Sequence, residues 1–135
     1  MKVVLDTNVV VSALLSPGGP CRRITDLVFE GSLEASVDAR ILAEYEAVAR
    51  RPHLPIEPAE ADELLTLVSA VARPVPATPL NVNLPHQDDL PFLEVAHAAG
   101  AILVTGNLRH FPKSQRAGVT VLSPRQFLDH LAASR

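Results

Sequence analysis

The stretch Lys2–Val11, KVVLDTNVVV, decides the fold that we expect for this chain. Its apolar residues Val3–Leu5 predict a short buried strand that runs directly into Asp6. A carboxylate at the end of a buried strand is costly unless it contacts water, a hydrogen-bond donor or a metal ion. In parallel α/β sheets, ligands bind at the carboxyl ends of the strands. Asp6 is therefore the first candidate functional residue.

Outward from this stretch, strand and helix patterns alternate along the chain. After the apolar run resumes at Val9–Val11, a loop is expected at 16–20, and the long connection at 73–87 has room for one short strand. We predict strands at 33–37, 101–105 and 119–122. We predict one helix that ends near residue 31, further helices over 38–51, 58–72 and 90–99, and a last helix that begins with the capping box at 123–126. This alternation predicts an α/β fold with a mainly parallel sheet.

Length and composition bound the function classes. A chain of 135 residues forms one domain, and no apolar run approaches the length of a membrane span. The N-terminus lacks a signal-peptide pattern, and the single cysteine, Cys21, belongs to no disulfide or zinc spacing. We therefore expect a cytoplasmic protein without a membrane association. The net charge of −3 gives no general basic surplus for nucleic acid, although acids gathered in a metal site would still allow such binding.

The helix predicted over 38–51 places one acid beside the core. Ile41, Tyr45 and Val48 recur at helical spacing and define the buried face. Glu44 falls about 60° to one side of Ile41, whereas Glu46 lies nearly opposite and is solvated. On this pattern alone, Glu44 is either an ordinary acid at the edge of the buried stripe or a functional group.

Two further candidates come from the ends of later elements. Asp88 and Asp89 directly precede the helix predicted over 90–99, where free N–H groups and the helix dipole favour a carboxylate. One of them is enough for a cap, so the other is available to a cleft. Asn107 follows the late strand and is expected at the same edge of the sheet as Asp6.

Several motifs keep a characteristic order: VLDTNV at 4–9, LAEY at 42–45, DDLPFLEVA at 88–96 and LVTGN at 103–107, then FP at 111–112, VTVL at 119–122 and PRQFL at 124–128. Together they resemble the PIN-domain ribonuclease family, which includes the VapC-type toxins of toxin–antitoxin pairs. The resemblance covers nearly the whole chain. It implies a single PIN-like domain over 1–135, built as a three-layer α/β/α sandwich around a central, mainly parallel sheet.

The resemblance also implies the site. Carried over by position, Asp6, Glu44 and Asp89 are the catalytic acids of a divalent-metal centre, and Asp88 is the alternative to Asp89. Mg²⁺ or Mn²⁺ suits such oxygen ligands, and clustered carboxylates repel one another unless a cation lies between them. A water of lowered pKa would then attack an RNA phosphodiester.

Other positions support the site or depart from the family pattern. Asn8 and Thr105 match polar residues that steady the acids. Asn107 stands where the family often has a fourth acid, and His110 stands where many relatives have Asp. The resemblance thus implies a centre with about three carboxylates and a weaker hold on a second ion.

Substrate and partners are expected as follows. Basic residues near the predicted sheet edge are candidate phosphate contacts, with scattered solubilising charge as the other interpretation; they are Arg22, Arg23, Arg109, Lys113 and Arg116. Only 4% of the residues are Phe, Trp or Tyr, which leaves little for a base-stacking platform. The histidines form no ligand spacing. The resemblance also implies a homodimer and an antitoxin partner.

Two other functions compete with the nuclease. A PIN fold weakened by Asn107 and His110 would act by binding an antitoxin or an RNA-processing partner. A small nucleotide-binding domain is the third hypothesis, but Gly18-Gly19 matches no phosphate-binding loop. We favour the enzyme, because a scaffold has no need of three separated acids.

Overall fold

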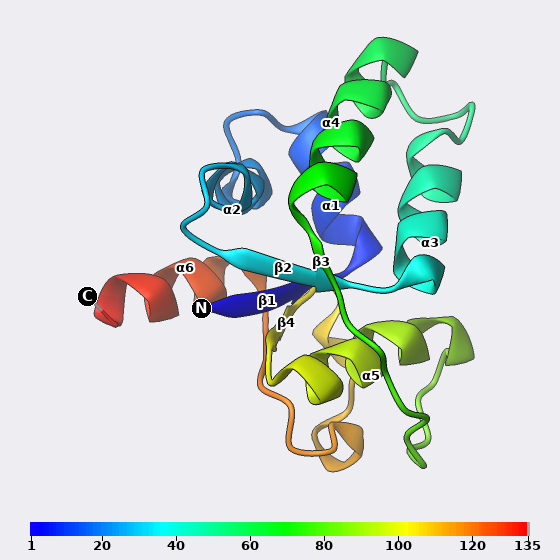
Figure 1. Ribbon diagram of the computed structural model, residues 1–135, viewed down its shortest axis with the longest axis vertical. Coiled ribbons are helices and arrows are strands. Elements are labelled where there is room, and N and C mark those ends of the chain that lie inside the picture. Colours follow the sequence, from blue (N-terminus) through cyan, green and yellow to red (C-terminus); the bar gives the residue numbers. More distant parts are fainter. Residues whose placement is uncertain (135) are drawn as a thin grey trace.

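A five-stranded parallel sheet, in the order β3-β2-β1-β4-β5, forms the centre of the computed structural model, which describes residues 1–134 (Figure 1). The strands are β1 Lys2–Leu5, β2 Glu34–Val37, β3 Arg73–Pro74, β4 Ile102–Val104 and β5 Val121–Leu122. The pairings between neighbouring strands are parallel. The α/β prediction is confirmed, and β1 lies in the middle of the sheet.

Helices cover both faces of this sheet. They are α1 Thr7–Leu15, α2 Pro20–Phe29, α3 Ala39–Ala49, α4 Pro58–Val71, α5 Leu90–Ala99 and α6 Pro124–Ala133, with short 3₁₀ turns η1 Gln87–Asp89, η2 Leu108–His110 and η3 Lys113–Gln115. Figure 1 shows α1, α3 and α4 on one side of the sheet and α5 on the other. Within residues 1–134, no helix is long and apolar enough to span a bilayer.

The core joins the central strand to the helices on either side. Val3 and Val4 of β1 are fully buried, as are Val9 and Val10 of α1. Leu93 of α5 is also fully buried and belongs to the same hydrophobic cluster. Because both faces of β1 are covered, the residue that follows it is held in place by packing on two sides.

Helix α1 was not predicted, since the β-branched run Val9–Val11 favours a strand. Asp6 decides otherwise: its Oδ1 accepts a hydrogen bond of 2.8 Å from the Thr7 backbone N–H and caps the helix. The buried residues Val9, Val10, Ala13 and Leu14 then follow helical spacing.

Smaller differences concern element ends and one buried face. Strands β4 and β5 are shorter than predicted, and the short strand expected after residue 72 is β3. On α3, Ile41 and Tyr45 are buried as predicted, whereas Val48 is half-buried and Ala49 takes the buried position. The capping box of α6 forms between Ser123 and Gln126.

Candidate active site

Asp6 lies at the carboxyl end of the central strand and is only 4% exposed. Its Oδ2 accepts hydrogen bonds from Thr105 Oγ1 at 2.7 Å and from Asn8 Nδ2 at 3.1 Å. The backbone N–H of Asp6 donates to Val104 O at 2.9 Å and continues the pairing of β1 with β4. The buried carboxylate is thus stabilised by donors from two neighbouring strand ends.

The residues after β4 complete this edge of the sheet. Gly106 N donates to Asn8 Oδ1 at 2.8 Å, and Asn107 N donates to Thr105 Oγ1 at 3.0 Å. A Cβ at Gly106 would lie 3.2 Å from Asn8 Oδ1, which is tighter than an ordinary contact. Gly106 therefore allows the close approach that lets Asn8 and Thr105 reach Asp6, and the structure brings all three predicted residues together.

Glu44 reaches the same region from α3. It is half-buried, as the helix pattern predicted, and its Oε2 accepts a hydrogen bond from Thr7 Oγ1. The next residue, Tyr45, is 2% exposed and its hydroxyl donates to Leu5 O. Since Leu5 and Thr7 flank Asp6, two contacts fix α3 against the end of β1.

Asp89 approaches from the start of α5. Its Oδ2 is buried and lies 2.9 Å from His110 Nδ1, but among residues 1–134 it has no hydrogen bond of good geometry. Burial raises the pKa of Asp89 most, the charge and close contact of His110 and the charge of His86 lower it, and the charge of Glu44 raises it. The charges of Asp89 and Glu44 therefore interact.

The charges of Asp6 and Asp89 interact in the same way. The pKa of Asp6 is raised, mainly by burial and also by the negative charge of Asp89, although the hydrogen bond from Thr105 lowers it. The pKa of Tyr45 is also raised by burial and by the charges of Asp6 and Glu44. Three acids far apart in the sequence thus affect one another across one edge of the sheet.

This donor set suits a hard divalent cation. Among residues 1–134, no three His, Cys, Asp or Glu side chains already form a group that could hold a metal ion. Asp6, Glu44 and Asp89 nevertheless supply carboxylate oxygens, and Asp89 Oδ2 is an acceptor without a partner of good geometry. Mutual repulsion of such acids is relieved by a cation.

Other predicted residues lie further from this centre or at its rim. Asp88 is exposed, and no hydrogen bond or ion pair of its side chain is found within residues 1–134. Asn107 is exposed and enters the site through its backbone N–H. Arg109 is exposed on η2, next to His110, and Lys113 is exposed on η3.

The remaining basic residues have partners or a different setting. Arg22 pairs with Asp26 on α2 at 3.3 Å, and Arg23 is exposed on the same helix. Arg116 donates to Phe111 O at 2.8 Å. None of these three contacts Asp6 or Asp89 in the part of the chain that the structure describes.

Sequence reasoning missed two side chains that contact the acids, and a buried acid on α5 outside the site. Thr7 orients Glu44, and His110, which we treated only as a missing acid, lies against Asp89. Glu94 of α5 is 4% exposed, pairs with Arg40 at 2.8 Å and accepts a bond from Leu80 N at 2.8 Å. Polar residues next to the ends of buried strands indicate that such contacts exist. Which side chains contact each other depends on the three-dimensional fold.

Comparison with known proteins identifies the family. A family model described as a PIN domain matches residues 2–109, which include all three acids. The chain belongs to the PIN domain family. PIN domains are generally nucleases, which agrees with the acidic edge described above.

The chain is also similar to individual proteins, one in sequence and two in fold. The chain is 30% identical over 141 residues to uncharacterized protein MJ1680 of Methanocaldococcus jannaschii, covering 96% of this chain and 90% of the relative. The PIN fold is shared with VapBC2 of Rickettsia felis, bound to a fragment of promoter DNA, at a TM-score of 0.62 and 16% identity, covering 91% of this chain and 98% of that chain. PAE2754 of Pyrobaculum aerophilum has a TM-score of 0.54 at 18% identity, covering 98% and 90% of the two chains.

Proposed function

We propose that this PIN domain is a Mg²⁺- or Mn²⁺-dependent endoribonuclease whose cation ligands are Asp6, Glu44 and Asp89. The gathering of these three acids at one edge of the sheet carries the proposal: Thr105 and Asn8 hold Asp6, Thr7 holds Glu44, and the pKa values of Asp6 and Asp89 are raised mainly by burial and also by the charges of Asp89 and Glu44, respectively. Such an arrangement is unfavourable for stability alone and favourable for holding a cation. The general nuclease activity of PIN domains supports the same conclusion.

The residues of the chain have separate roles in this proposal. Thr105 and Asn8 hold the Asp6 carboxylate, and Thr7 holds Glu44, so that both acids are fixed at the carboxyl edge of the sheet. Asp89 supplies an oxygen for which residues 1–134 offer no hydrogen bond of good geometry, although His110 Nδ1 lies 2.9 Å away. A bound divalent cation supplies Lewis-acid activation of a water and of the scissile phosphate.

The surface formed by η2 and η3 provides the contacts to the RNA backbone. Arg109 and Lys113 are exposed and form no ion pair within residues 1–134. Arg109 is adjacent in sequence to His110, which lies 2.9 Å from Asp89. We assign Arg109 and Lys113 to phosphates that flank the cleaved bond.

We further infer that the protein is the toxin of a toxin–antitoxin pair and forms a homodimer. The structural likeness to VapBC2, a complex that was solved with promoter DNA, supports an antitoxin partner for this chain. Co-expression with the protein encoded beside it, followed by measurement of the mass of the purified complex, tests both parts.

The enzyme is tested by cleavage of a short fluorogenic single-stranded RNA with Mg²⁺, with Mn²⁺ and with EDTA. Asp6→Asn and Glu44→Gln are expected to reduce cleavage at least 100-fold. Glu46→Gln is the matched control, because Glu46 is exposed on the same helix as Glu44 and pairs with Arg50. Equal cleavage by Asp6→Asn and wild type would overturn the proposal.

A second candidate is a PIN domain that only binds a partner. Two positions beside the acids favour it: Asn107 is exposed, and His110 contacts the Asp89 carboxylate. Absence of cleavage with every metal and several RNAs, from folded protein, would favour this candidate. Asn107→Asp and His110→Asp, which restore the family's acids, would then be expected to generate activity.

A further inference from the structure

Two histidine rings lie together at the rim of the acid site. The ring centroids of His86 and His110 are 4.5 Å apart, and their planes are inclined by 48°. His110 is half-buried and its Nδ1 lies 2.9 Å from Asp89 Oδ2. The inner ring of the pair thus faces a proposed cation ligand, and the outer ring, His86, is exposed.

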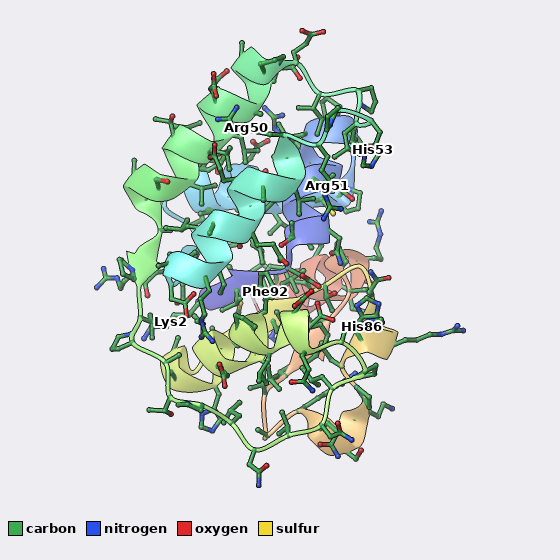
Figure 2. All side chains as sticks on the ribbon, turned by 90° about the vertical axis from the view of Figure 1, so that its right-hand side faces the viewer. Lys2, Arg50, Arg51, His53, His86 and Phe92 are labelled. Carbon is green, nitrogen blue, oxygen red and sulfur yellow. The ribbon has the colours of Figure 1, made fainter. Side chains whose placement is uncertain are left out.

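His86 differs in this respect from the larger aromatic residues. Among the described residues, Tyr45, Phe92, Phe111 and Phe127 are at most 2% exposed and belong to the core, and Phe29 is half-buried on α2. Figure 2 shows His86 near the beginning of α5, whereas His53 lies well above it in the same view, in the loop after α3. A count of Phe, Trp and Tyr, on which the sequence prediction relied, overlooks this exposed ring.

We infer that His86 is a stacking platform for one nucleobase of a single-stranded RNA substrate, next to the scissile phosphate. The inference rests on the proposed nuclease function and adds a specificity-determining residue to it. The ring of His110 packs against the inner face of the His86 ring and contacts Asp89, so His110 positions His86 beside this acid. The unpaired base would lie on the outer face of His86 while its phosphate reaches the acids.

The physical basis is the flat face that every base offers. Stacking of a base on an aromatic side chain tolerates any sequence and requires that the base be unstacked from its neighbours. Single-stranded segments meet that requirement at little cost, whereas a paired base must first leave the duplex. His86 therefore favours single-stranded over double-stranded RNA without reading a particular sequence.

The test is a binding cycle between the protein ring and the RNA base. Binding of a short fluorescent single-stranded RNA is measured in an Asp6→Asn background, which prevents cleavage. His86→Ala is expected to raise Kd about 5- to 100-fold, the range for removal of a base-stacking ring. His86→Phe keeps a flat ring and is expected to restore binding. His53→Ala, an exposed histidine in a distant loop, is expected to leave Kd unchanged.

The RNA side of the cycle locates the base. A series of oligonucleotides each carries one abasic nucleotide at a different position. At one position, the missing base is expected to weaken binding to the Asp6→Asn protein that retains His86, but not to the protein that also carries His86→Ala. If no position shows this dependence, or if Phe fails to restore binding, the stacking inference is overturned. The stacking inference is also overturned if His86→Ala binds RNA normally in the Asp6→Asn background and cleaves RNA normally when Asp6 is present. That result leaves the nuclease proposal intact.

The nuclease proposal can fail separately. Ring-dependent RNA binding without cleavage under any metal condition would support the platform and overturn the enzyme. The absence of both RNA binding and cleavage would overturn the two together.

Discussion

The hydroxyl of Thr7, in the first turn of α1, donates a hydrogen bond to Glu44 on α3. Thr7 is 6% exposed and follows Asp6 directly, so a single residue connects two of the three candidate ligands. The position of Glu44 is therefore set by α1 as well as by its own helix.

Thr7→Val keeps the shape of the side chain and removes this donor. We expect the affinity for Mn²⁺ to fall about 10-fold, because residues that orient metal ligands typically contribute this much. The free energy of unfolding should fall by about 1 kcal/mol, because the hydrogen bond to Glu44 is lost. Calorimetric titration with Mn²⁺ measures the first effect, and Thr66→Val, at an exposed position on α4, is the control. Unaltered Mn²⁺ affinity would contradict the role of Thr7.

Thr105→Val is expected to have a larger effect on stability. Thr105 is fully buried, donates to Asp6 Oδ2 and accepts from Asn107 N, so the substitution removes two hydrogen bonds. A loss of about 1–3 kcal/mol in the free energy of unfolding follows. Urea denaturation measures this loss, and Thr105→Ser, which retains the hydroxyl, should recover most of it. Equal losses in Ser and Val variants would assign the effect to packing instead.

Asp6 gives a prediction about pH in the absence of metal. Burial raises its pKa above the ordinary value of 3.8. Its contribution to stability is therefore fully present below about pH 4, where the carboxyl is protonated, and is lost as the pH rises through the folded-state pKa. In EDTA, Asp6→Asn should therefore become more stable relative to wild type as the pH rises from 4 through the folded-state pKa of Asp6, and the difference should then level off.

A saturating divalent cation should reverse this order at pH 8. Binding at 100 times the Kd stabilises a protein by about 2.7 kcal/mol, and Asp6→Asn would lose that gain. Denaturation curves of both proteins, with EDTA and with Mg²⁺, provide the comparison. A wild type whose stability relative to Asp6→Asn is flat between pH 4 and 8 would contradict the raised pKa.

The buried acid Glu94 predicts the consequence of a change at Arg40. Arg40→Met removes the ion pair with Glu94 at 2.8 Å and the more exposed pair with Asp38 at 2.7 Å, and leaves Glu94 with the Leu80 N–H as its remaining partner among residues 1–134. We expect a loss of about 1–2 kcal/mol, moderated because half of the Arg40 side chain is in water. Arg50→Met, which removes surface ion pairs with Glu46 and Asp62 and leaves no buried acid without a partner, should have a smaller effect. The unfolding midpoint in urea distinguishes the two, and equal effects would sink the assignment.

Arg109 gives a prediction about salt. If it neutralises one phosphate, Arg109→Ala should weaken RNA binding uniformly across sequences and lower the slope of log K against log salt by about 1. Titrations at several salt concentrations measure the slope. Arg125→Ala, on the exposed surface of α6, should leave the slope unchanged.

The parts of the fold that follow local patterns could be predicted from the sequence. The alternation of apolar segments gave the parallel sheet, and the 3.6-residue period placed Glu44 beside the core. Helix α1 could not be predicted, because the preference of three valines for a strand was outweighed by capping at Asp6 and by packing on β1. Tertiary contacts decide such cases.

The site shows the same division. Asp6, Asn8 and Thr105 lie at strand ends, so topology alone brings them together. The contact of His110 with Asp89 depends on the path of the loop after β4, and no periodicity encodes that path. The pairing of His86 with His110 likewise joins two loops and has no sequence pattern.

The hydrogen bond from Thr105 to Asp6 joins residues 99 positions apart. On a ribosome that adds about 5–20 residues per second, Thr105 is synthesised roughly 5–20 seconds after Asp6. Throughout that interval the growing chain contains its first acid without the strand, the loop and the helix that complete its surroundings. In the nuclease proposed here, the cutting centre therefore forms only after Thr105 has been synthesised, and a growing chain that stops before β4 has no complete acid site.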